Sequence, residues 1–133
     1  MDDKERYKQG MAVRRAVLGD EWVNLAQSKR NEFTAEFQEF ITRYAWGEVW
    51  SRPGLDRRSR SLMTLAMMIA LGRWDEFRLH IRAALNNGLS VDEIKEVILH
   101  SAIYAGVPAA NSAFAEAVDA LKECGIDLDS LAK

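Results

Sequence analysis

The placement of glycine and proline most constrains what this chain can fold into. The sequence has only 2 prolines and 8 glycines, and the glycines fall between segments whose apolar residues recur with a helical period. No segment shows the sustained apolar and polar alternation of a strand. A chain of 133 residues is long enough for one domain with a core. We therefore expect an all-α, single-domain helical bundle of about six to seven helices.

Start and stop signals along the chain give approximate bounds for these helices. Trp46, Trp50 and the turn at 51–54 follow one of them and show no obvious helical face. The core is expected over about 33–124. The signals predict an N-terminal helix over about 4–18, a short piece capped by Asp20, a helix over roughly 34–46, a helix from Asp56 to Gly72, one from Asp75 to Gly88, one that starts at a Ser90–Glu93 capping box, and one from Pro108 to about Cys124.

The two histidines of the chain occupy different helical faces. His80 recurs at helical spacing with Phe77, Ile81 and Ala84, so it is expected on an inward face. His100 lies on the flank of the next apolar face and is the weaker candidate. Histidine is the side chain most easily poised for proton transfer near neutral pH. If the protein is an enzyme, its chemistry is expected to pass through His80.

Composition excludes several classes of function. The formal net charge of −2 does not favour nucleic acid or an anionic membrane as a partner. Cys124 is the single cysteine, so neither an intrachain disulfide nor a cysteine-based metal site can form. No metal-ligand spacing, nucleophile elbow or phosphate loop occurs, and we expect no metal and no cofactor. The polar N-terminus and the short apolar run at 65–71 predict a cytoplasmic protein.

Several segments together carry a resemblance to a known family. They are His80-(seven residues)-Gly-Leu-Ser-Val-Asp-Glu-Ile-Lys-Glu-Val over 80–97, Tyr-Ala-Gly-Val-Pro-Ala-Ala-Asn over 104–111, and the stretches 44–61 and 79–88. Across roughly 33–118 the chain resembles the carboxymuconolactone decarboxylase and alkyl hydroperoxidase D-like superfamily, and its decarboxylase branch in particular. The resemblance implies the helical fold of that superfamily and homo-oligomeric rings, often hexamers. It also implies cofactor-free decarboxylation of 4-carboxymuconolactone to 3-oxoadipate enol-lactone in protocatechuate catabolism.

The chain departs from the peroxidase branch of that superfamily. Its two redox cysteine positions fall on Arg73 and Glu76, its relay glutamate falls on Ser61, and its histidine falls on His80. Without a thiol pair, thiol–disulfide exchange cannot occur. Thiol peroxidase activity is therefore excluded, while the scaffold and its histidine remain.

Decarboxylation needs a donor for the developing oxyanion, a proton source, and groups that hold the substrate carboxylates. His80 is the first choice for proton donor or oxyanion partner. Glu48, close to Trp46 and Trp50, is a second catalytic candidate, because burial would raise its pKa. The expected substrate contacts are Arg57, Arg58 and Arg60, which can bind carboxylates bidentately, together with the Asn86 amide and Tyr104.

Each of these residues also has a structural alternative. His80 can be a hydrogen-bonded core residue, the arginines can form a solvated or interface face, and Glu48 can pair with an arginine. Asn86 and the residue after it can simply end a helix. At the level of function, the alternatives are a related lactone or keto-acid enzyme on the same scaffold, and a non-catalytic helical oligomeric binding module. The expected partners are a small carboxylated lactone and further copies of the chain.

Overall fold

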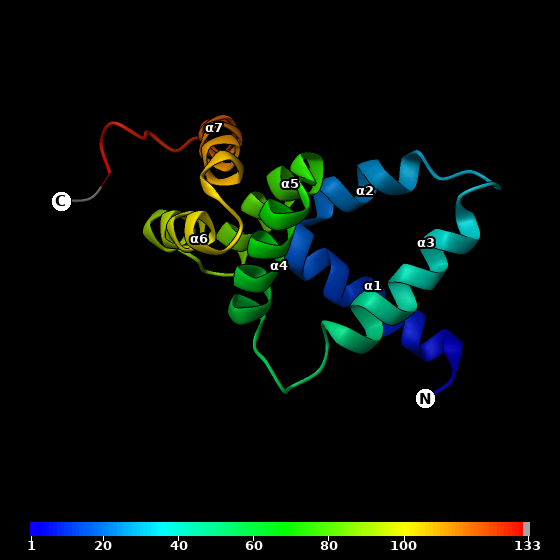
Figure 1. Cartoon of the computed structure of the whole chain (residues 1–133). Helices are drawn as coiled ribbons and strands as arrows, with labels where there is room; N and C mark the ends of the chain where they lie inside the picture. Colours follow the sequence, from blue (N-terminus) through cyan, green and yellow to red (C-terminus); the bar gives the residue numbers. More distant parts are fainter. Residues whose placement is uncertain (132–133) are drawn as a thin grey trace. The chain divides into compact units, whose positions relative to one another are not determined.

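The computed structural model describes residues 1–131 and is built from helices (Figure 1). Within these residues there is no strand, so the all-α prediction is confirmed. The chain groups into two compact units, Met1–Arg57 and the residues from Arg58 onward. The single-domain expectation stays a prediction. The elements are α1 (Asp3–Leu18), α2 (Asp20–Ser28), α3 (Ala35–Ile41), the π-helix η1 (Thr42–Val49), α4 (Arg57–Leu71), α5 (Trp74–Asn86), α6 (Val91–Tyr104) and α7 (Val107–Glu123).

In the first unit, α1 and η1 cross at two glycines. A Cβ atom at Gly10 would lie 1.9 Å from the carbonyl oxygen of Thr42, and one at Gly47 would lie 2.5 Å from that of Arg6. Only hydrogen is small enough at either position, so the two backbones approach more closely than side chains allow. The Nε2 atom of Gln9 donates to the Gly47 carbonyl oxygen at 3.2 Å across the same contact. The unit is therefore organised around a glycine-to-glycine crossing.

The helix expected over 34–46 is longer than predicted and changes type. Regular α-helix ends at Ile41, and a π-helix continues to Val49. Trp46 is buried on this π-helix, and its ring lies 5.1 Å from that of Trp50. The turn expected at 51–54 is confirmed. No helical face is visible in the sequence at Trp46 because a π-helix bonds residue i to i+5. Its side chains therefore do not follow the 3.6-residue period that was used to search for a face.

Two expected helix caps were also wrong. Asp20 and Asp75 lie inside the first turns of α2 and α5, and the N-cap positions are Gly19 and Arg73. A carboxylate in the first turn still interacts favourably with the helix dipole, so aspartate marks a helix start without fixing the cap. By contrast, the Ser90–Glu93 capping box is confirmed, with both of its hydrogen bonds present.

The second unit is held by a core shared among α4 to α7. Phe77, Leu65 and Ile81 are fully buried, and the ring of Trp74 meets Phe77 edge-on at 5.6 Å. Small side chains line the packed face of α7, which allows close helix contact. These buried residues are Ala110, Ala113, Ala117 and Ala120. Among the helices of residues 1–131, none combines the length and the apolarity that crossing a membrane requires.

Candidate active site

His80 lies on the inward face of α5, as its spacing predicts. Phe77, Ile81 and Ala84 on the same face are fully buried, and the Nδ1 atom of His80 is buried as well. Burial lowers the pKa of His80 from 6.5 to about 4, and the nearby Glu76 carboxylate opposes this shift only in part. The imidazole is therefore neutral at pH 7. A neutral imidazole can donate one N–H bond and accept another, but it does not bring a positive charge to the site.

We expect the imidazole of His80 to titrate near pH 4 in the folded protein, which an NMR pH titration measures directly. The folded pKa lies below the unfolded value of about 6.5. The unfolded chain therefore binds more protons, and this contribution to stability is present above pH 6.5 and is lost as pH falls toward 4. By pH 4 the loss is on the order of 3 kcal/mol.

His80→Gln removes this titration, so its unfolding free energy falls less between pH 7 and pH 4 than that of the wild type. A His100→Gln variant assigns the second imidazole signal. A folded-state midpoint for His80 near 6.5 would contradict this account of its burial.

The beginning of α4 meets the turn between α5 and α6. The guanidinium of Arg58 donates to the carbonyl oxygen of Gly88 and pairs with the carboxylate of Glu93. The Nδ2 atom of Asn87 donates to Oγ of Ser61 at 2.9 Å, and Ser61 is fully buried. The structure thus places Arg58, one of the predicted site residues, beside the turn that begins directly after Asn86, another of them.

The remaining predicted substrate contacts differ in accessibility. Arg57 and Asn86 are exposed, whereas Arg60 is partly buried. Tyr104 is 80% exposed at the end of α6, and its ring lies 4.9 Å from that of His100. Exposed residues can meet a ligand or a second copy of the chain, so their roles stay predictions.

Glu48 does not have the burial on which its proposed acid–base role depended. Its side chain is 49% exposed on η1, in the first unit. Its carboxylate lies 3.5 Å from Nη1 of Arg52 and 3.9 Å from Nε of Arg6. The structure thus shows the alternative reading, in which Glu48 pairs with arginine. A catalytic role for Glu48 stays a prediction without support from burial.

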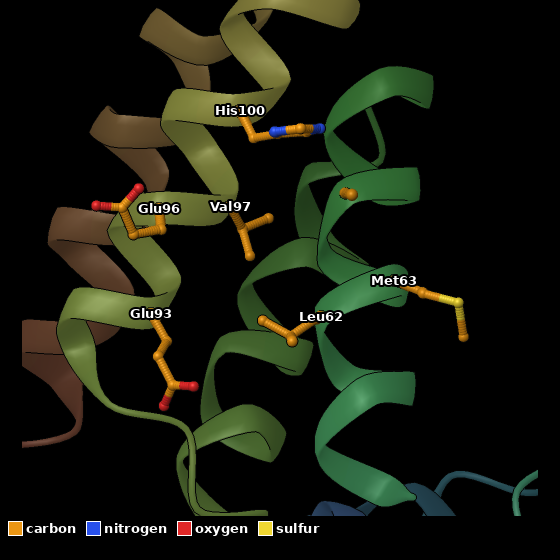
Figure 2. A pocket seen from close by; sticks show the side chains of 7 residues that line it. Leu62, Met63, Glu93, Glu96, Val97 and His100 are labelled. Carbon is orange, nitrogen blue, oxygen red and sulfur yellow. The ribbon is translucent and has the colours of Figure 1, made fainter. Parts of the chain in front are cut away.

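A pocket of about 430 Å³ lies between α4 and α6. Figure 2 shows the side chains of Val97 and His100 reaching from α6 toward α4. The lining is mainly apolar, and its polar side chains are Glu93, Glu96 and His100. The two glutamates in this lining do not favour an anionic ligand. The lining residues are Leu62, Met63, Ala66, Glu93, Glu96, Val97 and His100.

Sequence analysis missed three residues that the structure singles out. Glu93 was assigned only to a capping box, although it also lines the pocket and binds Arg58. Ser61 was noted only for its place in the superfamily pattern, and Asn87 as an amide donor or a helix end, but the hydrogen bond between them was not predicted. No local pattern signals contacts between residues that are 26 to 35 positions apart. Within residues 1–131, no group of three or more metal-ligating side chains is placed to hold a metal ion.

Comparison with known proteins agrees with this helical architecture. The profile of the carboxymuconolactone decarboxylase family matches residues 35–119, and the chain belongs to that family. It is 55% identical over 126 residues to the 4-carboxymuconolactone decarboxylase of Acinetobacter baylyi, covering 95% of this chain and 94% of that protein. It is 49% identical over 102 residues to the nitrosuccinic acid decarboxylase npaB of Metarhizium robertsii, covering 77% and 71%. A 4-carboxymuconolactone decarboxylase of Pseudomonas putida is 58% identical over 48 residues, which are 36% of this chain and 100% of that sequence.

Proposed function

We propose that the protein decarboxylates 4-carboxymuconolactone to 3-oxoadipate enol-lactone, without a cofactor, in protocatechuate catabolism. The observation that carries this proposal is the identity of 55% over nearly the full length of both chains with the Acinetobacter baylyi 4-carboxymuconolactone decarboxylase. Family membership alone would leave the substrate open, because one fold hosts several reactions. Similarity over nearly the full length of both chains favours this decarboxylation over the other reactions of the family.

The chemistry places defined demands on the site. The bond between the ring carbon and the departing carboxylate breaks, and CO2 leaves. The electron pair spreads through the ring double bond onto the lactone carbonyl oxygen, and a proton is then delivered to the ring carbon beside that carbonyl. The developing oxyanion needs a hydrogen-bond donor that is already in place. A neutral His80 fits this need, since one of its ring nitrogens carries an N–H that can donate to the oxyanion.

Apart from His80, most of the predicted site residues have the role of holding the substrate. Arg57 and Arg60 at the start of α4 bind carboxylates, the Asn86 amide and Tyr104 donate hydrogen bonds, and Glu48 remains a candidate for proton transfer. A guanidinium at a helix start is disfavoured by the helix dipole, and a bound carboxylate would compensate for that cost. The departing carboxylate is the one that gains most from a poorly solvated position.

A second candidate is decarboxylation of nitrosuccinic acid. The relative named for that activity is 49% identical to this chain over 102 residues. In both substrates the loss of CO2 leaves electron density that moves onto an oxygen-bearing group. CO2 release from each compound, measured side by side with pure protein, separates the two. Faster turnover of nitrosuccinic acid would overturn our assignment, and turnover of neither would favour a non-catalytic binding module.

We also propose a homo-oligomer, and specifically a hexamer. Large apolar side chains are left exposed on the second unit of the single chain, and such patches mark interaction surfaces. They include Met67, Leu71, Leu99, Ile103, Tyr104 and Val107. Light scattering measures the mass in solution, and a stable, active monomer would contradict this proposal.

We propose neither nucleic acid nor a membrane as a partner, because the net charge of the chain is −2. The cytoplasmic location stays a prediction that cell fractionation tests.

A further inference from the structure

Two residues of α4 hold two consecutive residues of the turn that follows α5. Arg58 and Ser61 are three positions apart, so they lie on the same face of the helix. Ser61 accepts a hydrogen bond of 2.9 Å from the Asn87 amide, and Arg58 donates to the Gly88 carbonyl oxygen. Gly88 has φ +88°, a left-handed conformation that glycine adopts without strain. Two side chains of α4 therefore hold the turn at two adjacent residues, Asn87 and Gly88.

The same arginine joins this turn to the start of α6. Its second terminal nitrogen pairs with Oε2 of Glu93. The other carboxylate oxygen of Glu93 accepts the Ser90 backbone N–H at 2.9 Å, and Ser90 Oγ accepts the Glu93 backbone N–H at 3.0 Å. The bond from Ser90, followed by the charge of Arg58, lowers the pKa of Glu93, so the carboxylate stays ionised. We call Arg58, Ser61, Asn87, Gly88 and Glu93 the turn clamp.

The hydrogen bond between Ser61 and Asn87 matters for stability, because breaking it would leave a buried hydroxyl without this partner. Ser61 is fully buried, and a buried hydroxyl that loses its partner destabilises a fold more than an apolar side chain would. The ion pair contributes little to stability, because the side chains of Arg58 and Glu93 are 45% and 36% exposed. The main consequence of the turn clamp is geometric, since it fixes the end of α5 against the start of α4.

The turn clamp also occupies Arg58. Both of its terminal nitrogens donate to the chain, one to Gly88 and the other to Glu93. A substrate carboxylate at Arg58 would have to compete with Glu93 for the charge of this guanidinium. Arg58, one of the three arginines expected to bind substrate, is thus bonded to the turn and to α6.

We propose that Arg58 and Ser61 are positioning residues, which hold Asn86 at the end of α5 in register with Arg60 on α4 through the turn clamp. This inference rests on the proposed function, because Asn86 and Arg60 are the substrate contacts expected there. A displacement of about 1 Å in such contacts can lower the rate by about 100-fold. Neither positioning residue touches substrate.

The test compares Arg58→Ala and Ser61→Ala with the control Arg78→Ala. Arg78 joins α5 to α7 through Glu116 at 3.1 Å and Glu123 at 2.5 Å, so the control breaks an interhelical ion pair away from the turn. We expect kcat/KM to fall by about 10-fold or more in both turn-clamp variants, and by less than about 2-fold in the control. Hydrogen exchange at the amides of 87–89 is expected to speed up in the two variants only.

Three outcomes would overturn the inference. Unchanged exchange at 87–89 would show that the turn clamp does not hold the turn. Faster hydrogen exchange at 87–89 with unchanged kcat/KM would show that the turn clamp stabilises the turn without affecting catalysis. A raised KM in Arg58→Ala alone, with Ser61→Ala behaving as the wild type, would make Arg58 a direct substrate ligand. If the wild type itself releases no CO2, the proposed function fails, and the exchange data still report separately on whether the turn clamp exists.

Discussion

Replacing His80 with alanine is expected to lower kcat by about 100- to 1,000-fold while the protein stays folded. The reason is that His80 is the histidine on the buried face of α5, where its pKa of about 4 keeps it neutral at pH 7. A neutral N–H donor in a poorly solvated place stabilises a developing oxyanion without needing to reorganise. Steady-state kinetics of CO2 release from 4-carboxymuconolactone measure the effect.

Two further variants separate a chemical role of His80 from a structural one. His80→Gln retains an N–H donor, so it is expected to recover part of the lost kcat. His100→Ala is the matched control, because His100 is exposed beside Tyr104, and its kcat is expected within about 3-fold of the wild type. Circular dichroism checks that each variant is folded. Full activity in a folded His80→Ala protein would remove His80 from the mechanism.

Replacing Gly10 with alanine is expected to lower the free energy of unfolding by about 3 kcal/mol or more. The added Cβ would lie 1.9 Å from the carbonyl oxygen of Thr42, a backbone atom that cannot rotate away. At an open position inside a helix the same substitution would stabilise by about 1 kcal/mol, so the sign of the change is itself informative. Urea unfolding followed by circular dichroism measures it.

Gly54→Ala is the control for this effect, since a Cβ at Gly54 meets nothing within 4 Å. It is expected to change the unfolding free energy by less than about 0.5 kcal/mol. If Gly10→Ala is as stable as the wild type, then α1 and η1 do not cross as closely as the structure has them.

Local signals in the sequence predicted most of the helical framework. A glycine with positive φ follows the last residue of five helices within two positions, because glycine tolerates that conformation. These glycines are Gly19, Gly72, Gly88, Gly106 and Gly125. The Ser90–Glu93 capping box and the inward face of His80 follow equally from spacing within a few residues. These features depend on neighbours along the chain, which is why periodicity and capping preferences capture them.

The features that were missed depend on tertiary contact. The π-helix at Thr42–Val49 contains Gly47, which packs against α1, and a search for a 3.6-residue period does not detect it. The pairing of Arg58 with Glu93 and of Ser61 with Asn87 joins residues far apart in sequence. The aromatic residues near Glu48 in the sequence do not show whether its carboxylate is buried or paired with an arginine. The structure shows the pairing.

We propose that this chain needs no other protein and no cofactor to remove CO2 from 4-carboxymuconolactone. The most direct measurement follows CO2 and ultraviolet absorbance with pure protein that has been dialysed against a chelator. We expect one CO2 to be released for each lactone consumed, with the enol-lactone as product and a rate that dialysis does not change. Lactone that disappears no faster than in buffer alone would contradict it.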